Sequence, residues 1–148
     1  MEIDFAAIAP EGLKAMRDLE MHVRRSGLEK SLLELVKTRA SQINGCAYCI
    51  DMHTKDARIN GETEQRLYSL SAWRETPFFS TRERAALAWA EALTRISSTG
   101  IREGLMEETL RFFSERELVN LTLAVIAING WNRLALSSRI VAGSYQPS

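Results

Sequence analysis

Apolar residues recur at helical spacing along almost the whole chain, and this pattern limits the fold more than any other feature. In the segments 10–27, 29–43 and 46–60 they return every three or four residues. No segment alternates apolar and polar residues with the period of two that a half-buried strand requires. The sequence therefore predicts an all-α fold, an irregular bundle of six to eight helices.

Local stop and start signals divide the pattern into separate helices. Asn44-Gly45 and Asn60-Gly61 are typical of helix C-termini, because both residue types tolerate the left-handed conformation found there. Serine is followed by glutamate three positions later at residues 80–83 and 114–117, the spacing of a capping box at a helix N-terminus. These signals predict further helices at about 62–73, 81–96, 103–113 and 118–140.

The length of the chain fits one domain. With 148 residues, a single domain over 1–148 can bury a sizeable core without disulfides or metal ions. Residues 144–148 lie beyond the last helical pattern, and we expect them to form a loose tail.

Charge and hydropathy exclude two classes of partner and indicate a compartment. The chain has 19 basic and 19 acidic residues, without the basic stripe that nucleic acid binding requires. It has no run of about 20 apolar residues for a membrane span, and its acidic N-terminus does not resemble a secretion signal. We therefore expect a cytoplasmic protein that binds neither nucleic acid nor membrane.

The candidate site is the segment Cys46-Ala47-Tyr48-Cys49, followed by His53. On a helix, Cys46, Cys49 and His53 occupy positions i, i+3 and i+7 and share one face. Two thiols one turn apart can form a disulfide, and a helix N-terminus favours the thiolate. A disulfide closing so short a loop would stabilise the fold little, so the pattern favours a redox-active pair.

Other readings of the same residues remain. The cysteines could be small core residues, or they could bind zinc together with His53 and either His22 or Glu34. Closed zinc sites usually combine two separated ligand pairs, and the sequence has no second pair. Thioredoxin-like chemistry normally needs a fold with strands, so a dithiol on a helical scaffold is the favoured interpretation, and no metal or cofactor is expected.

The spacing of four residues resembles a family signature. Glu34, Cys46, Cys49 and His53 match E-x11-C-x-x-C-x3-H of the AhpD-like alkylhydroperoxidases, within the carboxymuconolactone decarboxylase superfamily. Residues 34–37, 41–46 and 129–134 are also similar to that family. The resemblance implies an all-helical, AhpD-like fold, assembly as a trimer or hexamer, and reduction of hydroperoxides through a cysteine pair and a proton relay.

The resemblance also implies a role for each site residue. Cys49 would attack the peroxide, Cys46 would resolve the sulfenic acid, and His53 with Glu34 would relay protons. The helix-dipole argument, by contrast, favours Cys46 as the more acidic thiol. Tyr48 stands where a relay histidine can stand in the family, and a phenol exchanges protons at neutral pH less readily than an imidazole.

Some of these residues have a purely structural alternative. Glu34 could form an exposed ion pair with Lys30 or Lys37 at helical spacing. His22 is expected at the surface. We expect the three tryptophans to serve core or subunit packing: Trp73, Trp89 and Trp131.

Together these observations predict a thiol-dependent peroxidase that reduces alkyl hydroperoxides. An external dithiol or reductase, of lipoyl or thioredoxin type by resemblance, would restore the cysteine pair. The alternative is a redox-responsive or general disulfide-exchange protein that acts on protein thiols and has little peroxidase activity. The intact cysteine pair speaks against a lactone decarboxylase, which needs no dithiol.

Overall fold

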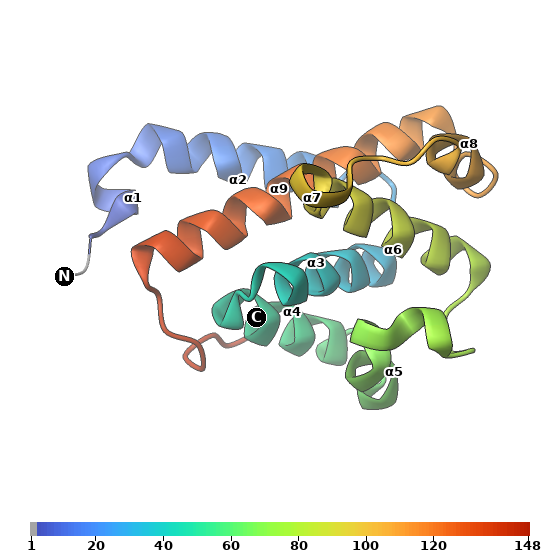
Figure 1. Ribbon diagram of the computed structural model, residues 1–148. Helices are drawn as coiled ribbons and strands as arrows, with labels where there is room; N and C mark the ends of the chain where they lie inside the picture. Colours follow the sequence, from blue (N-terminus) through green and yellow to red (C-terminus); the bar gives the residue numbers. More distant parts are fainter. Residues whose placement is uncertain (1–2) are drawn as a thin grey trace.

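The computed structural model describes residues 3–148, and within them all regular structure is helical (Figure 1). The all-α prediction is confirmed. The nine α-helices described exceed the predicted six to eight because α1 and α7 are single turns with weak sequence signals. The helices are α1 (Phe5–Ile8), α2 (Pro10–Arg24), α3 (Lys30–Asn44), α4 (Ala47–Ile59), α5 (Glu64–Ser69), the 3-10 helix η1 (Leu70–Glu75), α6 (Thr81–Thr94), α7 (Ile96–Thr99), α8 (Leu105–Thr109) and α9 (Glu115–Ser138).

Helix α3 lies at the centre of the molecule and packs against α4, α6 and α9 (Figure 1). Every residue from Leu32 to Ser41 is buried, so the helix has no solvent-facing side along this length. The charged residues of this stretch, Glu34, Lys37 and Arg39, are therefore buried with it. Because a buried charge is costly unless it is paired, each must find a partner on a neighbouring helix.

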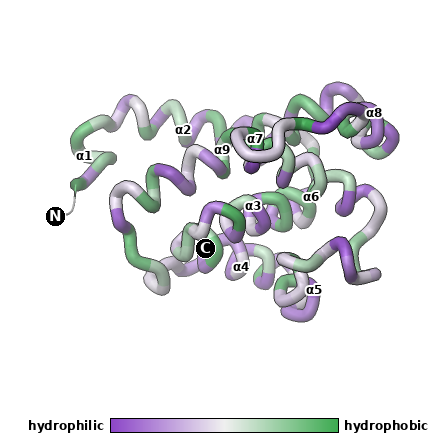
Figure 2. The backbone as a smooth tube through the Cα atoms, viewed as in Figure 1, coloured by the Kyte–Doolittle hydropathy of each residue, from purple (hydrophilic) through white to green (hydrophobic). Residues whose placement is uncertain are grey.

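Two apolar clusters flank α3, and hydrophobic residues alternate with hydrophilic stretches along most helices (Figure 2). One cluster joins α3 to α6 and α9 and includes Val36, Trp89 and Leu121. The other joins α3 to α4, η1 and α6 and includes Leu35 and Trp73. Both tryptophans are buried packing residues, as the sequence predicts.

Helices α6 and α9 begin at the capping boxes that the sequence predicts. Both predicted capping boxes form, at Ser80 and Ser114, with side-chain and backbone hydrogen bonds in both directions. Helix α9 runs unbroken through Gly130, where a Cβ atom would lie only 2.8 Å from Cε of Met16. Glycine at this position therefore lets α2 and α9 approach closely.

The turn between α3 and α4 sets the position of the cysteine pair. Gly45 has φ 70° and ends α3 in the left-handed conformation, with its N–H bonded to the carbonyl of Gln42. The Asn44 amide donates hydrogen bonds of 2.9 Å to the side chains of Asn129 and Asn132 on α9. These bonds fix the turn against α9, and α4 begins directly after Cys46.

The C-terminal residues, predicted as a loose tail, return to α4 (Figure 1). The Tyr145 hydroxyl donates a 2.6 Å hydrogen bond to Asp56, and the Tyr145 carbonyl accepts one of 3.0 Å from Lys55. Within residues 3–148 there is no helix long and apolar enough to cross a membrane.

Candidate active site

Cys46 and Cys49 are joined by a disulfide, with their Cα atoms 5.3 Å apart. Cys46 is the N-cap of α4 rather than its first helical residue, and its Sγ accepts a 3.4 Å hydrogen bond from the backbone N–H of Cys49. Both residues are buried, with exposed fractions of 1% and 4%. The pair therefore meets the N-terminal N–H groups of α4, as the sequence predicts, but in a site that shields it from bulk solvent.

A cavity of about 880 Å³ adjoins Cys49. Tyr48, Cys49 and His53 line it from α4, whereas Cys46 does not. Trp131 on α9 also lines it, so this tryptophan faces an open cavity, unlike the two in the core. A small molecule entering the cavity would meet Cys49 before Cys46.

His53 and Glu34 form a buried pair between α4 and α3. Nδ1 of His53 lies 3.0 Å from Oε2 of Glu34, and the two residues are 6% and 7% exposed. A Glu34 carboxylate accepts the N–H at Nδ1, which leaves Nε2 as the nitrogen able to exchange protons. No hydrogen bond to Nε2 is formed by any residue in the described range 3–148. The alternative of an exposed Glu34 paired with Lys30 or Lys37 is wrong, because Glu34 is buried and Lys37 has another partner.

That partner is Glu20 on α2. Nζ of Lys37 lies 2.6 Å from Oε1 of Glu20, and the Lys37 side chain is 2% exposed. Burial tends to raise the pKa of Glu20, but the charge and hydrogen bond of Lys37, with the charges of Arg24 and His53, hold it below its ordinary value. Glu20 lines the large cavity, and its Oε2 has no hydrogen-bond partner among the described residues.

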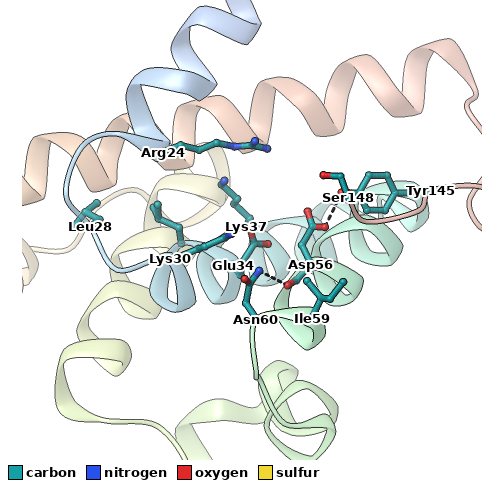
Figure 3. A pocket seen from close by; sticks show the side chains of 11 residues that line it. Arg24, Leu28, Lys30, Glu34, Lys37, Asp56, Ile59, Asn60, Tyr145 and Ser148 are labelled. Atoms are coloured by element: carbon teal, nitrogen blue, oxygen red, sulfur yellow. Dashed lines mark hydrogen bonds between the residues drawn. The ribbon is translucent and has the colours of Figure 1, made fainter.

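A second cavity, of about 320 Å³, is lined by Glu34 but not by its partner His53 (Figure 3). Glu34 and Lys37 line it from α3, Asp56 from α4 and Tyr145 from the C-terminal segment. The hydrogen bond to Asp56, with burial, raises the pKa of Tyr145 to about 12. Arg24 lines both cavities, whereas Glu34 lines only the smaller one and His53 only the one at Cys49.

One group of side chains has the composition of a metal site. Ligand atoms of Glu34, His53 and Asp56 all lie within 4.8 Å of one another. The cationic side chains of Arg24 and Lys37 line the adjoining cavity, and their charges oppose binding of a cation there. The zinc alternative combined Cys46, Cys49 and His53 with His22 or Glu34, and here the two cysteines are joined in a disulfide. His22 is exposed on α2, as expected, and hydrogen-bonds to Asn120 at 2.9 Å.

Four residues around the site were not among the candidate site residues of the sequence: Glu20, Lys37, Asp56 and Tyr145. Asp56 follows His53 by three positions, and Lys37 follows Glu34 by three, so helical spacing alone could have indicated their proximity. Glu20 and Tyr145 come from distant parts of the chain, and no local signal marks them.

Comparison with known proteins agrees with the fold and identifies the family. Residues 10–92 match the model of the carboxymuconolactone decarboxylase family. The uncharacterized protein YdfG of Bacillus subtilis (strain 168) is 44% identical over 135 residues, which cover 91% of this chain and 92% of YdfG.

Solved structures show the same architecture. A protein of unknown function from Agrobacterium tumefaciens, for which a role as the antioxidant defence protein AhpD has been suggested, matches with a TM-score of 0.92 and 43% identity. The match covers 97% of this chain and 99% of that one. An uncharacterized peroxidase-related protein from Silicibacter sp. TM1040 matches with a TM-score of 0.80 and 25% identity, over 90% of this chain and 71% of that one. This chain belongs to the carboxymuconolactone decarboxylase family and has the AhpD-like fold.

Proposed function

We propose that this protein is a thiol-dependent peroxidase that reduces organic hydroperoxides through Cys49 and Cys46. The observation that carries the proposal is the arrangement at the large cavity. Cys49 and His53 line this cavity, and Glu34 hydrogen-bonds to Nδ1 of His53. A nucleophile and a proton carrier one helical turn apart are what cleavage of a peroxide bond needs.

In the first step, His53 accepts the Cys49 thiol proton at Nε2. The thiolate then attacks the terminal peroxide oxygen, so that an S–O bond forms and the O–O bond breaks. The electron pair leaves with the alkoxide, which takes the proton from His53 and departs as the alcohol. The sulfur is oxidised to a sulfenic acid, and the peroxide is reduced.

In the second step, His53 accepts the Cys46 thiol proton, and the Cys46 thiolate attacks the sulfur of Cys49. An S–S bond forms, the S–O bond breaks, and the hydroxide takes the proton to leave as water. In the disulfide the Cα atoms lie 5.3 Å apart, within the range usual for such bonds. An external dithiol then reduces the disulfide and is itself oxidised.

Burial argues for small substrates over protein thiols. Cys46 and Cys49 are 1% and 4% exposed, so a folded partner protein could not bring a thiol onto either sulfur without opening the site. A slender dithiol, such as a lipoyl group, is small enough to enter the cavity beside Cys49 and is the reductant we propose.

The test follows both cysteines after one equivalent of cumene hydroperoxide is added to the reduced protein. Mass spectrometry should show a sulfenic acid at Cys49 that converts to the disulfide, and Cys46→Ser should accumulate the sulfenic acid. Cys49→Ser should leave the peroxide unconsumed. Oxidation no faster than in Cys49→Ser would refute the proposal, and trapped mixed disulfides with proteins in its place would favour a disulfide-exchange role.

Homo-oligomeric assembly and a cytoplasmic location are part of the proposal. Val119 and Ile126 occupy one face of α9 and are 59% and 54% exposed, an arrangement that supports a subunit contact. Sedimentation velocity should give a trimer or hexamer at micromolar concentration. A monomer under these conditions would remove this part of the proposal.

A further inference from the structure

The large cavity offers far more apolar surface than a small peroxide can use. Its volume of about 880 Å³ lies near the upper end of the roughly 300–1,000 Å³ typical of ligand pockets. Apolar side chains line it from four elements, among them Phe5, Leu13, Met52, Trp131 and Leu134. Hydrogen peroxide gains nothing from such walls, whereas a long hydrocarbon chain is stabilised by them.

The charged groups at the cavity are not balanced against one another. Arg17 lines the cavity from α2, and within residues 3–148 its side chain has no ion pair or hydrogen bond. Arg24 lines the cavity as well, and its Nε lies 3.3 Å from Oε1 of Glu20, which also pairs with Lys37 at 2.6 Å. Asp4 accepts the N–H of Ala7 as the N-cap of α1. Among the described residues, three cationic side chains therefore stand against two carboxylates at the cavity. The Arg17 guanidinium has no carboxylate partner in the described part of the chain, so it can pair with an anionic end group of a ligand in the apolar cavity.

We infer that the cavity takes an amphipathic carboxylate, a hydroperoxide of the long-chain fatty acid class. Its hydrocarbon chain packs along α1, α2 and α9, its carboxylate pairs with Arg17, and its hydroperoxide group lies at Cys49. The reduction of the bound hydroperoxide rests on the proposed function. The binding of the amphipathic carboxylate rests only on the cavity and the side chains that line it. The chemical step is the one given above, with the hydroxy fatty acid and water as products.

Binding can be tested without any peroxide. Titration with oleate, below its micelle concentration, should change the fluorescence of Trp131 in the wild-type protein and not in Trp131→Phe. Methyl oleate should bind about five-fold more weakly than oleate, the upper end for an ion pair that keeps contact with water. Equal affinities for acid and ester, or no response to either, would overturn the inference even if the protein reduces peroxides.

Turnover supplies the second test, with dithiothreitol as reductant. Arg17→Gln should lower kcat/KM for linoleic acid hydroperoxide about five-fold more than for its methyl ester. Arg25→Gln, at an exposed arginine outside the cavity, is the matched control and should change neither. Ala135→Phe, which narrows the cavity, should lower kcat/KM for linoleic acid hydroperoxide more than for tert-butyl hydroperoxide.

The outcomes separate this inference from the proposed function. If tert-butyl hydroperoxide is reduced but Ala135→Phe affects all substrates equally, the peroxidase holds and the substrate class is wrong. If Ala135→Phe instead changes the sedimentation coefficient and oleate does not bind, a second copy of the chain occupies the cavity. If oleate binds and no hydroperoxide is reduced, the cavity is a fatty-acid site and the peroxidase is wrong.

Discussion

Nδ1 of His53 and Oε2 of Glu34 lie 3.0 Å apart in the interior, on two helices that meet at the buried centre of the molecule. The carboxylate fixes which ring nitrogen carries the proton, and in the proposed mechanism it would stabilise the imidazolium that forms when His53 accepts a thiol proton. In that mechanism His53 passes its proton to the departing alkoxide, whereas Glu34 acts through His53 and does not touch the peroxide.

Removing the charge of Glu34 should therefore slow the reaction while leaving the fold in place. Glu34→Gln is expected to lower kcat/KM for cumene hydroperoxide by roughly 100-fold, the lower end of the effect of a general acid–base group. Stopped-flow measurement with the reduced protein gives the rate. Glu11→Gln, at an exposed position of α2, is the control. Equal rates in wild type and Glu34→Gln would assign Glu34 a purely structural role.

The sequence predicts the helix ends better than it predicts this pair. The two capping boxes and Gly45 depend on neighbours within four residues, so local chemistry decides them. Glu34 has two lysines at helical spacing, and from the residues alone a surface ion pair explains it equally well. Only the family spacing favours a relay role, and that role remains a proposal.

The sequence does not specify which residues pair with the buried charged side chains. Lys37 reaches Glu20 across 17 positions of chain, and Tyr145 reaches Asp56 across 89. These contacts depend on how α2 and the C-terminal segment pack against α3 and α4, which no local pattern specifies. The short helices α1 and α7 were missed for a related reason, since a single turn carries too few residues for a periodic signal.

Breaking the Lys37–Glu20 pair should be costly. Lys37→Met leaves the buried Glu20 carboxylate with Arg24, 3.3 Å away, as its remaining cationic partner. We therefore expect a loss of about 3 kcal/mol in the free energy of unfolding, the lower end for a broken buried ion pair. Urea denaturation followed by circular dichroism measures it. Lys30→Met, at an exposed position of the same helix, should change stability by less than about 0.5 kcal/mol. The double variant with Glu20→Gln should recover part of the loss; no recovery would mean that packing, not charge, explains the effect.

Acid should destabilise the protein through its buried carboxylates. Burial tends to raise the pKa of Glu91, but hydrogen bonds from Arg74, Arg39 and Trp73 hold it below the ordinary 4.5, and Glu20 is likewise lowered. A carboxyl group with a lowered pKa in the folded state contributes stability above its unfolded pKa and loses it as the pH falls through the folded value.

We therefore expect the free energy of unfolding to be constant from pH 7 to about pH 5 and to fall steeply below about pH 4.5. Glu91→Gln should be less stable at pH 7 and show a shallower fall. Glu115→Gln, at an exposed position of α9, should follow the wild type. A Glu91→Gln curve parallel to the wild type at all pH values would contradict this account.

The Tyr145 hydroxyl should lose its proton at a higher pH than an ordinary tyrosine, and its deprotonation should release the C-terminal segment from α4. Its hydrogen bond to Asp56 raises the pKa of its hydroxyl to about 12. The stability that it contributes is present below the unfolded pKa near 10 and is lost as the pH rises through about 12. Absorbance at 295 nm should show a late tyrosine transition that disappears in Tyr145→Phe.

Tyr68 gives a control for that titration. Its pKa is also raised, by a hydrogen bond to Glu64, but it is exposed and far along the chain from the C-terminal segment. Tyr68→Phe should leave the transition near pH 12 in place. If Tyr145→Phe leaves that transition unchanged, the hydrogen bond to Asp56 does not persist in solution.

Replacing Tyr48 by histidine should increase the proposed peroxidase activity. Tyr48 lines the large cavity beside Cys49 and His53, and its hydroxyl forms no hydrogen bond with any side chain or backbone group in residues 3–148. A phenol near pKa 10 is a poor proton carrier at neutral pH, whereas an imidazole near 6.5 is a good one. Tyr48→His should therefore raise kcat/KM for cumene hydroperoxide several-fold at pH 7, and Tyr48→Phe should not. If Tyr48→Phe loses activity as well, the hydroxyl itself takes part in the reaction, and the argument that it is a weak substitute for histidine fails.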